Sequence, residues 1–378
     1  MKVISVFGTR PEAIKMAPLL KAMQNSRDLE SIVAVSAQHR EMLDRVLQLF
    51  DIRPDYDLNL MRPGQSLSDI TSAVLSGLHP ILEQEKPDLL LVHGDTTTTF
   101  AAALAAYYHQ APVGHVEAGL RSGDRYAPYP EECNRRLAGV IADLHFAPTE
   151  TAAANLRREN IPEESIFITG NTVIDALLSA LEKPCPMDGL GLENVDWQKK
   201  VILMTCHRRE NWGQPMEEIF SATADFLRVN PDCQLIIPLH KNPLVREIAY
   251  RCLGGSAQVH YCEPLDYLPF CHVMQRSHLV LTDSGGLQEE APALGKPVLV
   301  LRDVTERPEA VAAGTAMLAG TSYQSVYEHL QMLLHQPERY AQMAQARNPY
   351  GDGKAAERIT AILENRAAQL AAKRQAAE

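Results

Sequence analysis

The segment Leu279–Ala310 reads LVLTDSGGLQEEAPALGKPVLVLRDVTERPEA and indicates how the whole chain folds. It predicts an apolar strand, a glycine turn, a helix that opens with polar residues, a second apolar strand and a charged loop. Ser284, Gly285 and Gly286 fall where the first strand gives way to the helix. Backbone N–H groups can approach an anion closely at such a turn, and the helix dipole favours its negative charge. The segment therefore predicts a βαβ unit with a diphosphate site.

Charged residues follow the turn. A carboxylate one turn into the helix, at Glu289 or Glu290, can accept hydrogen bonds from both hydroxyls of a ribose. Arg302 and Arg307 in the loop after the second strand supply cations for the diphosphate. An ordinary βαβ unit with a capping serine and a solvated acidic pair explains this segment equally well, because a short motif is only a hypothesis. The rest of the chain must decide between the two interpretations.

The alternation of short apolar runs and helix-sized intervals continues along the 378 residues and is typical of parallel βαβ units. The predicted strands are residues 3–7, 31–36, 88–93, 112–116, 144–148, 166–170, 201–206, 234–239, 278–283 and 297–301. A segment rich in Pro, Gly and charge, Pro184–Lys200, separates the two series. We expect a Rossmann-like domain over residues 1–170, a second over residues 171–353 that binds the nucleotide, and an Ala-rich helix over residues 354–378 that packs back on the first domain.

The composition excludes several classes of function. The net charge of −11 argues against nucleic acid and acidic membrane surfaces as partners. Seven cysteines without a CxxC pair argue against a disulfide framework and a structural zinc site, which predicts a reducing cytoplasm. The amino terminus has too short an apolar run for a signal peptide, and no segment approaches the ~20 apolar residues of a membrane span. We therefore expect a cytoplasmic protein.

Charged side chains gather in the loops after the predicted strands, where ligands of open parallel sheets bind. These residues are Arg10, Lys15, Asp95, Glu117, Glu131, His207 and His240. Singly, most have a structural explanation: Asp95 resembles a helix cap, and Glu117 could hold a buried partner such as Arg121. Their convergence on one rim favours an active site.

The motifs narrow the chemistry of that site. The first glycine loop, FGTRPE, is not a GxGxxG fingerprint, so hydride transfer with a nicotinamide loses its usual support. The acids and histidines occupy separate loops without a recognisable ligand spacing, which makes a metal site a weak hypothesis. We therefore predict acid/base chemistry on a nucleotide-linked substrate, with neither cofactor nor metal.

With these residues in view, the chain closely resembles the non-hydrolysing bacterial UDP-N-acetylglucosamine 2-epimerases over nearly its whole length. The resemblance is carried by long ordered motifs, namely FGTRPEAIKMAPL from Phe7, AQHREMLD from Ala37, VHGDTTTT from Val92, GHVEAGLRSGD from Gly114, PEECNRRL from Pro130, TGNTVIDAL from Thr169, HRREN from His207, the Leu281–Ala310 run and NPYGDG from Asn348. It implies a GT-B arrangement of two Rossmann-like domains with an interdomain cleft, usually in a homodimer. It also implies reversible conversion of UDP-GlcNAc to UDP-ManNAc for cell-surface polysaccharide synthesis, through anti elimination of UDP to a 2-acetamidoglucal and re-addition.

The resemblance also implies residue roles. The catalytic residues would be Asp95, Glu117, Glu131 and His207. The substrate contacts would be Arg10, Lys15, Phe270, Ser284, Gly285, Gly286, Glu290 as the ribose ligand, and Arg307. A second UDP-GlcNAc that activates some bacterial members would bind at Gln38, Arg208 and His240.

This sequence departs from the family pattern at three positions. Cys206 replaces a small residue, Leu265 replaces a Gln near the nucleotide, and Tyr129 replaces a Trp. None of the three removes a candidate catalytic group. The alternatives that stay open are a hydrolysing epimerase, a GT-B UDP-sugar glycosyltransferase and a catalytically silent UDP-sugar sensor.

Overall fold

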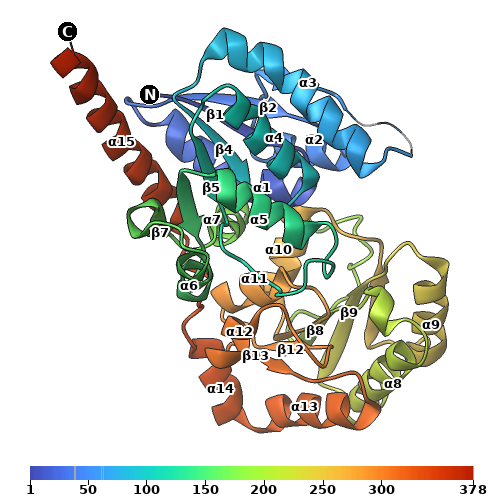
Figure 1. The fold of residues 1–378 in the computed structure, drawn as a ribbon. Coiled ribbons are helices and arrows are strands. Elements are labelled where there is room, and N and C mark those ends of the chain that lie inside the picture. The colour runs from blue at the N-terminus through green and yellow to red at the C-terminus, as the bar shows by residue number, and fades with distance from the viewer. Residues whose placement is uncertain (38–39, 61, 63, 378) are drawn as a thin grey trace. The chain divides into compact units, whose positions relative to one another are not determined.

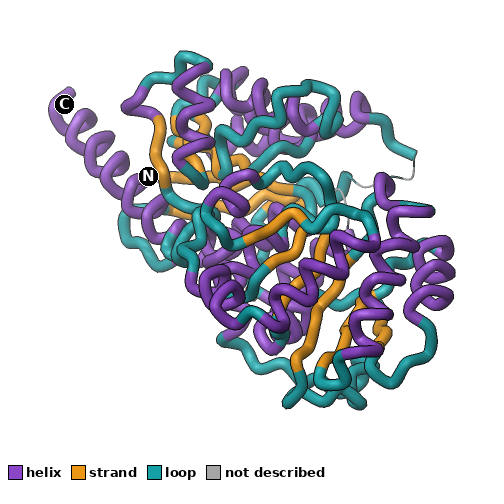
Figure 2. The backbone as a smooth tube through the Cα atoms, turned by 90° about the horizontal axis from the view of Figure 1, so that it is seen from below, coloured by secondary structure: helices purple, strands orange, loops and turns teal. Residues whose placement is uncertain are grey.

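The computed structural model describes residues 1–37, 40–60, 62 and 64–377, and the chain divides into two compact units. The first unit comprises Met1–Ser179 and Tyr350–Glu378, and the second comprises Ala180–Pro349. Each unit contains one parallel sheet whose strands alternate in the sequence with helices (Figures 1 and 2). The predicted α/β class with two doubly wound, Rossmann-like sheets is therefore confirmed.

The sheet of the first unit has the order β3-β2-β1-β4-β5-β6-β7 and is parallel throughout. Its strands are β1 (Lys2–Phe7), β2 (Glu30–Val35), β3 (Tyr56–Asp57), β4 (Leu89–His93), β5 (Val113–Val116), β6 (Leu144–Ala147) and β7 (Ile166–Ile168). Its helices are α1 (Arg10–Gln24), α2 (Arg40–Leu49), α3 (Leu67–Glu85), α4 (Thr97–Tyr108), α5 (Glu131–Ile141), α6 (Glu150–Arg158), α7 (Thr172–Leu181) and α15 (Ala355–Ala377), with a 3₁₀ turn η1 (Glu163–Ser165). The central strands are almost wholly apolar because helices cover both faces.

The sheet of the second unit has the order β10-β9-β8-β11-β12-β13. Its strands are β8 (Lys200–Thr205), β9 (Cys233–Pro238), β10 (Val259–Cys262), β11 (Leu279–Thr282), β12 (Val298–Val300) and β13 (Ala316–Leu318). Its helices are α8 (Gln214–Val229), α9 (Pro243–Leu253), α10 (Tyr267–Arg276), α11 (Leu287–Ala293), α12 (Pro308–Ala312), α13 (Tyr323–His335) and α14 (Pro337–Gln345), with a 3₁₀ turn η2 (Arg209–Asn211). In both sheets the chain direction across the sheet reverses next to the first strand, so β1/β4 and β8/β11 mark the switch points at which such folds bind ligands.

All ten predicted strands are present, and the structure adds β3, β10 and β13. Each of these three strands lies at an edge of its sheet. An edge strand has a neighbour on one side only and is short here, so its apolar pattern is weak. Within the described chain no helix is both long and apolar enough to cross a membrane.

Glu12 joins the first two loops of the first sheet. Its side chain completes a capping box with Thr9, and its carboxylate accepts hydrogen bonds from the N–H groups of Gly8 and Thr9 at 3.1 and 2.8 Å. The same carboxylate accepts hydrogen bonds from the hydroxyls of Thr96 at 2.8 Å and Thr99 at 3.2 Å. Burial raises the pKa of Glu12, although these hydrogen bonds oppose the shift. The loops that follow β1 and β4 are thus fixed to each other.

The carboxyl-terminal helix α15 packs against α1 of the first unit (Figure 1). Asp175 on α7 accepts hydrogen bonds from the N–H groups of Ala355 and Ala356 at 3.2 and 2.8 Å, which satisfies the amino-terminal end of α15. One turn before α15, the carbonyl of Tyr350 accepts a 2.6 Å hydrogen bond from the N–H of Asn171. The first unit is therefore built from both ends of the chain.

Candidate active site

Glu117 directly follows β5 and is the best-anchored acid of the first unit. Its φ of +62° lies in the left-handed region, which a glutamate seldom adopts. Its Oε1 accepts a 2.8 Å hydrogen bond from Asn171 Nδ2 and forms an ion pair with Lys15. The side chain is only 8% exposed. Strained backbone of this kind persists where the surroundings fix it and is concentrated at functional sites.

Arg121 is not the partner of Glu117. It forms a bidentate pair with Glu159, with Nε and Nη2 at 2.7 and 2.6 Å from the carboxylate oxygens. The interpretation of Glu117 as a structural residue held by Arg121 is therefore wrong. Lys15 and Asn171 supply the positive charge and the hydrogen bond instead, and both come from motifs of the resemblance.

His93, the last residue of β4, was missed in the sequence analysis. Its Nε2 lies 3.5 Å from Glu117 Oε2, and the side chain is 3% exposed. Burial lowers the pKa of His93 to about 4, so the ring is neutral at neutral pH. His115 and His145 face each other in the register of the adjacent strands β5 and β6, and burial lowers their pKa values to about 3 and about 4. The only sequence signal for His93 is its place before the Gly-Asp loop.

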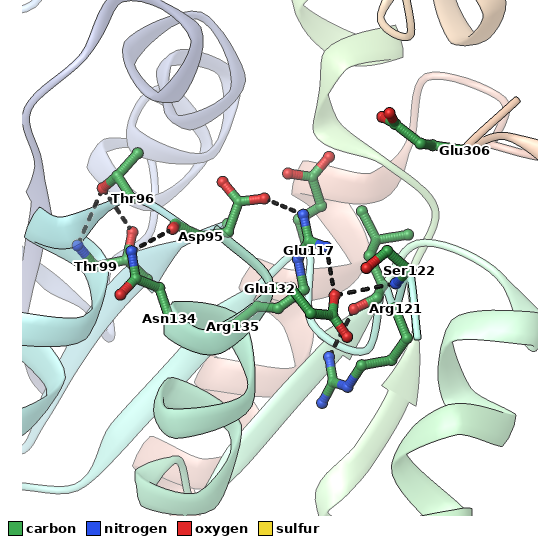
Figure 3. Close-up of polar contacts among 12 residues, drawn as sticks. Asp95, Thr96, Thr99, Glu117, Arg121, Ser122, Glu132, Asn134, Arg135 and Glu306 are labelled. Atoms are coloured by element: carbon green, nitrogen blue, oxygen red, sulfur yellow. Dashed lines mark hydrogen bonds and ion pairs between the residues drawn. The ribbon is translucent and has the colours of Figure 1, made fainter. Parts of the chain in front are cut away.

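Asp95 belongs to a chain of polar contacts between the loop after β4 and helix α5 (Figure 3). Its carboxylate forms an ion pair with Arg135, and its carbonyl accepts a 3.0 Å hydrogen bond from Asn134. Thr96, not Asp95, caps α4, because its hydroxyl accepts the N–H of Thr99 at 3.1 Å. The capping explanation of Asp95 is therefore wrong, and its carboxylate is directed toward α5.

Glu132 and Glu131 have different environments although they are adjacent. Glu132 is completely buried and accepts hydrogen bonds from Ser122 N at 3.0 Å, Arg135 Nη1 at 2.8 Å and Arg136 Nε at 3.1 Å. Burial opposes ionisation of Glu132, but these three donors outweigh it and lower its pKa. Glu131 Oε2 is buried without a hydrogen-bond partner among the described residues. A buried carboxylate oxygen without a donor is costly, so Glu131 is the one of the pair that structure alone does not explain.

The glycine turn of the second unit lies between β11 and α11. A Cβ atom built on Gly285 would be 4.0 Å from both Arg208 Nη2 and Arg307 Cζ, so two guanidinium groups border the turn. Within the described residues, no carbonyl or side chain accepts the N–H of Gly285 or Gly286. Helix α11 has only seven residues, so its dipole is weaker than that of a longer helix.

The two acids of α11 are buried, so the explanation of a solvated pair is wrong. Glu289 forms an ion pair with Arg307, and Glu290 Oε1 accepts a 2.9 Å hydrogen bond from the hydroxyl of Tyr267. The cation of Arg302 is directed elsewhere, to Glu210 at 2.8 Å. Arg307 is therefore the arginine of this loop that contacts both the turn and its helix.

His207 follows β8, and its ring is 43% exposed. The ring stacks at 5.8 Å and 27° on His240, which follows β9. Burial lowers the pKa of His240, and the nearby His207 adds to the shift. Phe270 on α10 and Arg10 at the start of α1 are half-buried. Gln38 lies outside the described residues, and no group of three or more metal-ligating side chains occurs within them.

The two doubly wound sheets, with charged residues in the loops at the ends of their strands, define an α/β protein of the GT-B type. A family model described as UDP-N-acetylglucosamine 2-epimerase matches residues 21–364. The UDP-N-acetylglucosamine 2-epimerase of Escherichia coli K12 is 56% identical over 371 residues, which cover 97% of this chain and 99% of that protein.

Solved structures agree with the sequence comparison. The crystal structure of UDP-GlcNAc 2-epimerase from Neisseria meningitidis bound to UDP-GlcNAc matches with a TM-score of 0.87 and 52% identity, covering 96% of this chain and 99% of that one. The Methanocaldococcus jannaschii enzyme in complex with UDP-GlcNAc and UDP matches with a TM-score of 0.78 and 34% identity, covering 96% and 99%. The chain belongs to the UDP-N-acetylglucosamine 2-epimerase family, and the resemblance predicted from its motifs is confirmed.

Proposed function

We propose that this chain interconverts UDP-GlcNAc and UDP-ManNAc by inverting C2 without net hydrolysis. The observation that carries the proposal is the group of acids at the strand ends of the first sheet, in which Glu117 is held by Lys15 and Asn171 and Glu131 keeps an unpartnered oxygen. The relatives named as UDP-GlcNAc 2-epimerases, and the Neisseria structure bound to UDP-GlcNAc, support the choice of substrate.

The chemistry explains why several acids are needed. The proton on C2 of the sugar is not adjacent to a carbonyl and is not acidic, so direct removal is unattractive. In an anti elimination, the C1–O bond breaks with its electron pair leaving on UDP, a carboxylate takes the C2 proton, and a C1–C2 double bond forms. UDP then adds back to C1 while C2 receives a proton on the opposite face. Carboxylates must therefore accept and return protons on two faces.

Asp95, Glu117 and Glu131 are the residues that we assign to these proton transfers. Lys15 and Asn171 hold the carboxylate of Glu117 in place through an ion pair and a hydrogen bond. Glu131 Oε2 is buried and has no competing hydrogen-bond donor among the described residues. Asp95 is kept in place by Arg135 of α5.

The second unit is assigned to the nucleotide. The N–H groups of the Ser284–Gly286 turn and the guanidinium of Arg307 would bind the diphosphate, as anion sites of this kind do. Glu290 would accept the ribose hydroxyls, and Phe270 would lie near the nucleotide. The resemblance also assigns Arg10 and Lys15 to UDP contacts, and His207 would assist the departure of UDP.

Proton NMR tests the proposal directly. Purified protein is incubated with UDP-GlcNAc in deuterated water without added NAD or metal, and we expect UDP-ManNAc that carries deuterium at C2. Free ManNAc together with UDP would establish the hydrolysing reaction instead. Unchanged UDP-GlcNAc would refute epimerisation and favour a glycosyltransferase or a UDP-sugar sensor, which transfer to an acceptor and calorimetric binding would separate.

Three further expectations remain predictions. A homodimer is tested by light scattering of the eluting protein. A second UDP-GlcNAc at Gln38, Arg208 and His240 predicts that the conversion of UDP-ManNAc accelerates when a trace of UDP-GlcNAc is added. Arg208 borders Gly285, so its guanidinium is equally placed for the diphosphate of the substrate. The cytoplasmic location is tested by cell fractionation.

A further inference from the structure

Asp283 is a buried acid of the second unit whose two oxygens differ. It follows β11 and its side chain is 0% exposed. Its Oδ2 accepts three hydrogen bonds, from the N–H groups of His207 and Arg208, each at 2.8 Å, and from Asn211 Nδ2 at 3.1 Å. Its Oδ1 is buried and has no hydrogen-bond partner in the described structure. That oxygen lies 3.9 Å from Nε2 of His207, and the two groups form an ion pair when the ring is protonated.

The sheet topology brings the two residues together. Strands β8 and β11 are neighbours at the switch point of the second sheet, and Thr205 pairs with Thr282 in their register. The hydroxyls of these two threonines lie 2.6 Å apart, so the strands end level with each other. Asp283 comes directly after the end of β11, and His207 is the second residue after the end of β8. Their proximity is therefore a property of the rigid sheet, and not of a mobile surface loop.

Other titratable and charged groups surround His207 on several elements. The ring of His240, whose pKa is lowered by burial, stacks on His207 from the loop after β9. Arg246 of α9 donates a 3.2 Å hydrogen bond to the carbonyl of His240. Arg208 is held by Glu306 at 3.3 Å. Cys206 is buried beside Asp283, and burial together with that carboxylate raises the pKa of its thiol far above the ordinary value, so the thiol stays uncharged. Within the described residues, the only carboxylate that forms an ion pair with His207 is Asp283.

We propose that Asp283 is the positioning residue of His207: three hydrogen bonds from the His207 loop fix the loop, and the unpartnered Oδ1 stabilises the protonated imidazole. His207 can then give the proton of its other nitrogen, Nδ1, to the diphosphate oxygen of UDP as the C1–O bond breaks, and take the proton back when UDP adds to C1. Asp283 remains a carboxylate throughout. This inference rests on the proposed function.

The substitution D283N distinguishes a purely structural role of Asp283 from stabilisation of the protonated His207 ring. In D283N the amide oxygen can keep all three hydrogen bonds to the His207 loop, because Asn and Asp have nearly the same shape. The substitution removes the negative charge and turns an NH₂ donor toward His207 Nε2. A structural role is therefore preserved in D283N, whereas stabilisation of the imidazolium is lost.

The experiment compares rate–pH profiles of wild type, D283N, H207N and the double variant with UDP-GlcNAc. We expect D283N to lower kcat at least about tenfold, to change KM less than about threefold, and to move the alkaline limb of kcat/KM to lower pH. In the H207N background D283N should change kcat less than about twofold, because both substitutions interrupt the same proton transfer. An unchanged limb in D283N, or full additivity in the double variant, would overturn the proposal.

A measurement on the wild type covers the case in which D283N does not fold. Nitrogen-15 NMR of the ring of His207, identified by its loss in H207N, reports which nitrogen carries the proton in the neutral form. A proton on Nε2, which faces the carboxylate, supports the proposal, and a proton on Nδ1 overturns it. If the wild type does not epimerise at all, the proposed function fails. If it does epimerise and only these results are contrary, then only the role of Asp283 fails.

Discussion

Acid should weaken the first unit because three buried histidines lie on adjacent strands of its sheet, β4, β5 and β6. Burial lowers the pKa values of His93, His115 and His145 to about 4, about 3 and about 4. Unfolding returns each ring to an ordinary pKa of about 6.5. Between these values the unfolded chain binds more protons than the folded one. The contribution of the neutral histidines to the free energy of unfolding is therefore fully present above pH 6.5 and is lost as the pH decreases toward 4.

The size of the effect follows from the shifts. Lowering the pH from 7 to 5 should cost about 2 kcal/mol of unfolding free energy for each such histidine. The substitution H115Q removes one titrating ring, so its loss between pH 7 and pH 5 should be smaller than that of the wild type by about 2 kcal/mol. H79Q is the matched control, because His79 is exposed with a side chain that is 60% accessible.

The assay must separate the two units, which need not unfold together. Both tryptophans, Trp197 and Trp212, belong to the second unit, so their fluorescence follows that unit alone. Hydrogen exchange of peptides from β4, β5 and β6 reports the first unit. For each variant, the quantity compared is the change in unfolding free energy between pH 7 and pH 5. Any destabilisation that the substitution causes at both pH values cancels in this difference. Equal losses in wild type and H115Q would refute the assignment of His115 as a buried neutral base.

Glu117→Gln should slow epimerisation about 100-fold or more while UDP binding by calorimetry changes little, since the lost group acts in proton transfer; undiminished turnover would return Glu117 to a structural role. Arg307→Ala should weaken UDP binding about tenfold or more, because a charge-assisted contact is lost, and unaltered binding would remove Arg307 from the diphosphate site. Gly119→Ala should destabilise the first unit by about 2 kcal/mol more than Gly123→Ala in urea unfolding. Both glycines have φ +87°, but only at Gly119 would the added Cβ meet a backbone oxygen, that of Ala152 at 2.3 Å, so equal losses would disprove the clash.

Much of the fold could be predicted because buried parallel strands are continuous apolar runs. LLLVH and VILMTC are examples, and right-handed crossovers limit the topologies that such a series of strands can form. The positions of Asp95, Glu117 and His207 followed from the rule that functional residues lie after strand ends. These predictions needed only local pattern and chain order.

The partners of these residues could not be predicted in the same way. Glu117 is held by Lys15 and Asn171, at sequence separations of 102 and 54. The sequence offered the nearer Arg121, but α6 places Glu159 beside that arginine. Whether Arg121 pairs with Glu117 or with Glu159 depends on how the helices pack, and no local sequence pattern contains that information. The sequence did not single out Asp283 for the same reason, because the lack of a partner at its Oδ1 depends on how the surrounding elements pack.

The return of the chain to the first unit constrains when this protein can become active during its synthesis. Ala355, whose N–H is accepted by Asp175 of α7, lies 180 residues after that aspartate. Asn171 donates its N–H to Tyr350 and its side chain to Glu117, so its own anchor is also made late. At ~5–20 residues per second a ribosome needs roughly 10–40 s to bridge this interval. Until then the nascent chain carries a sheet of the first unit in which Glu117 has yet to receive its final support, and the second unit is complete before the first.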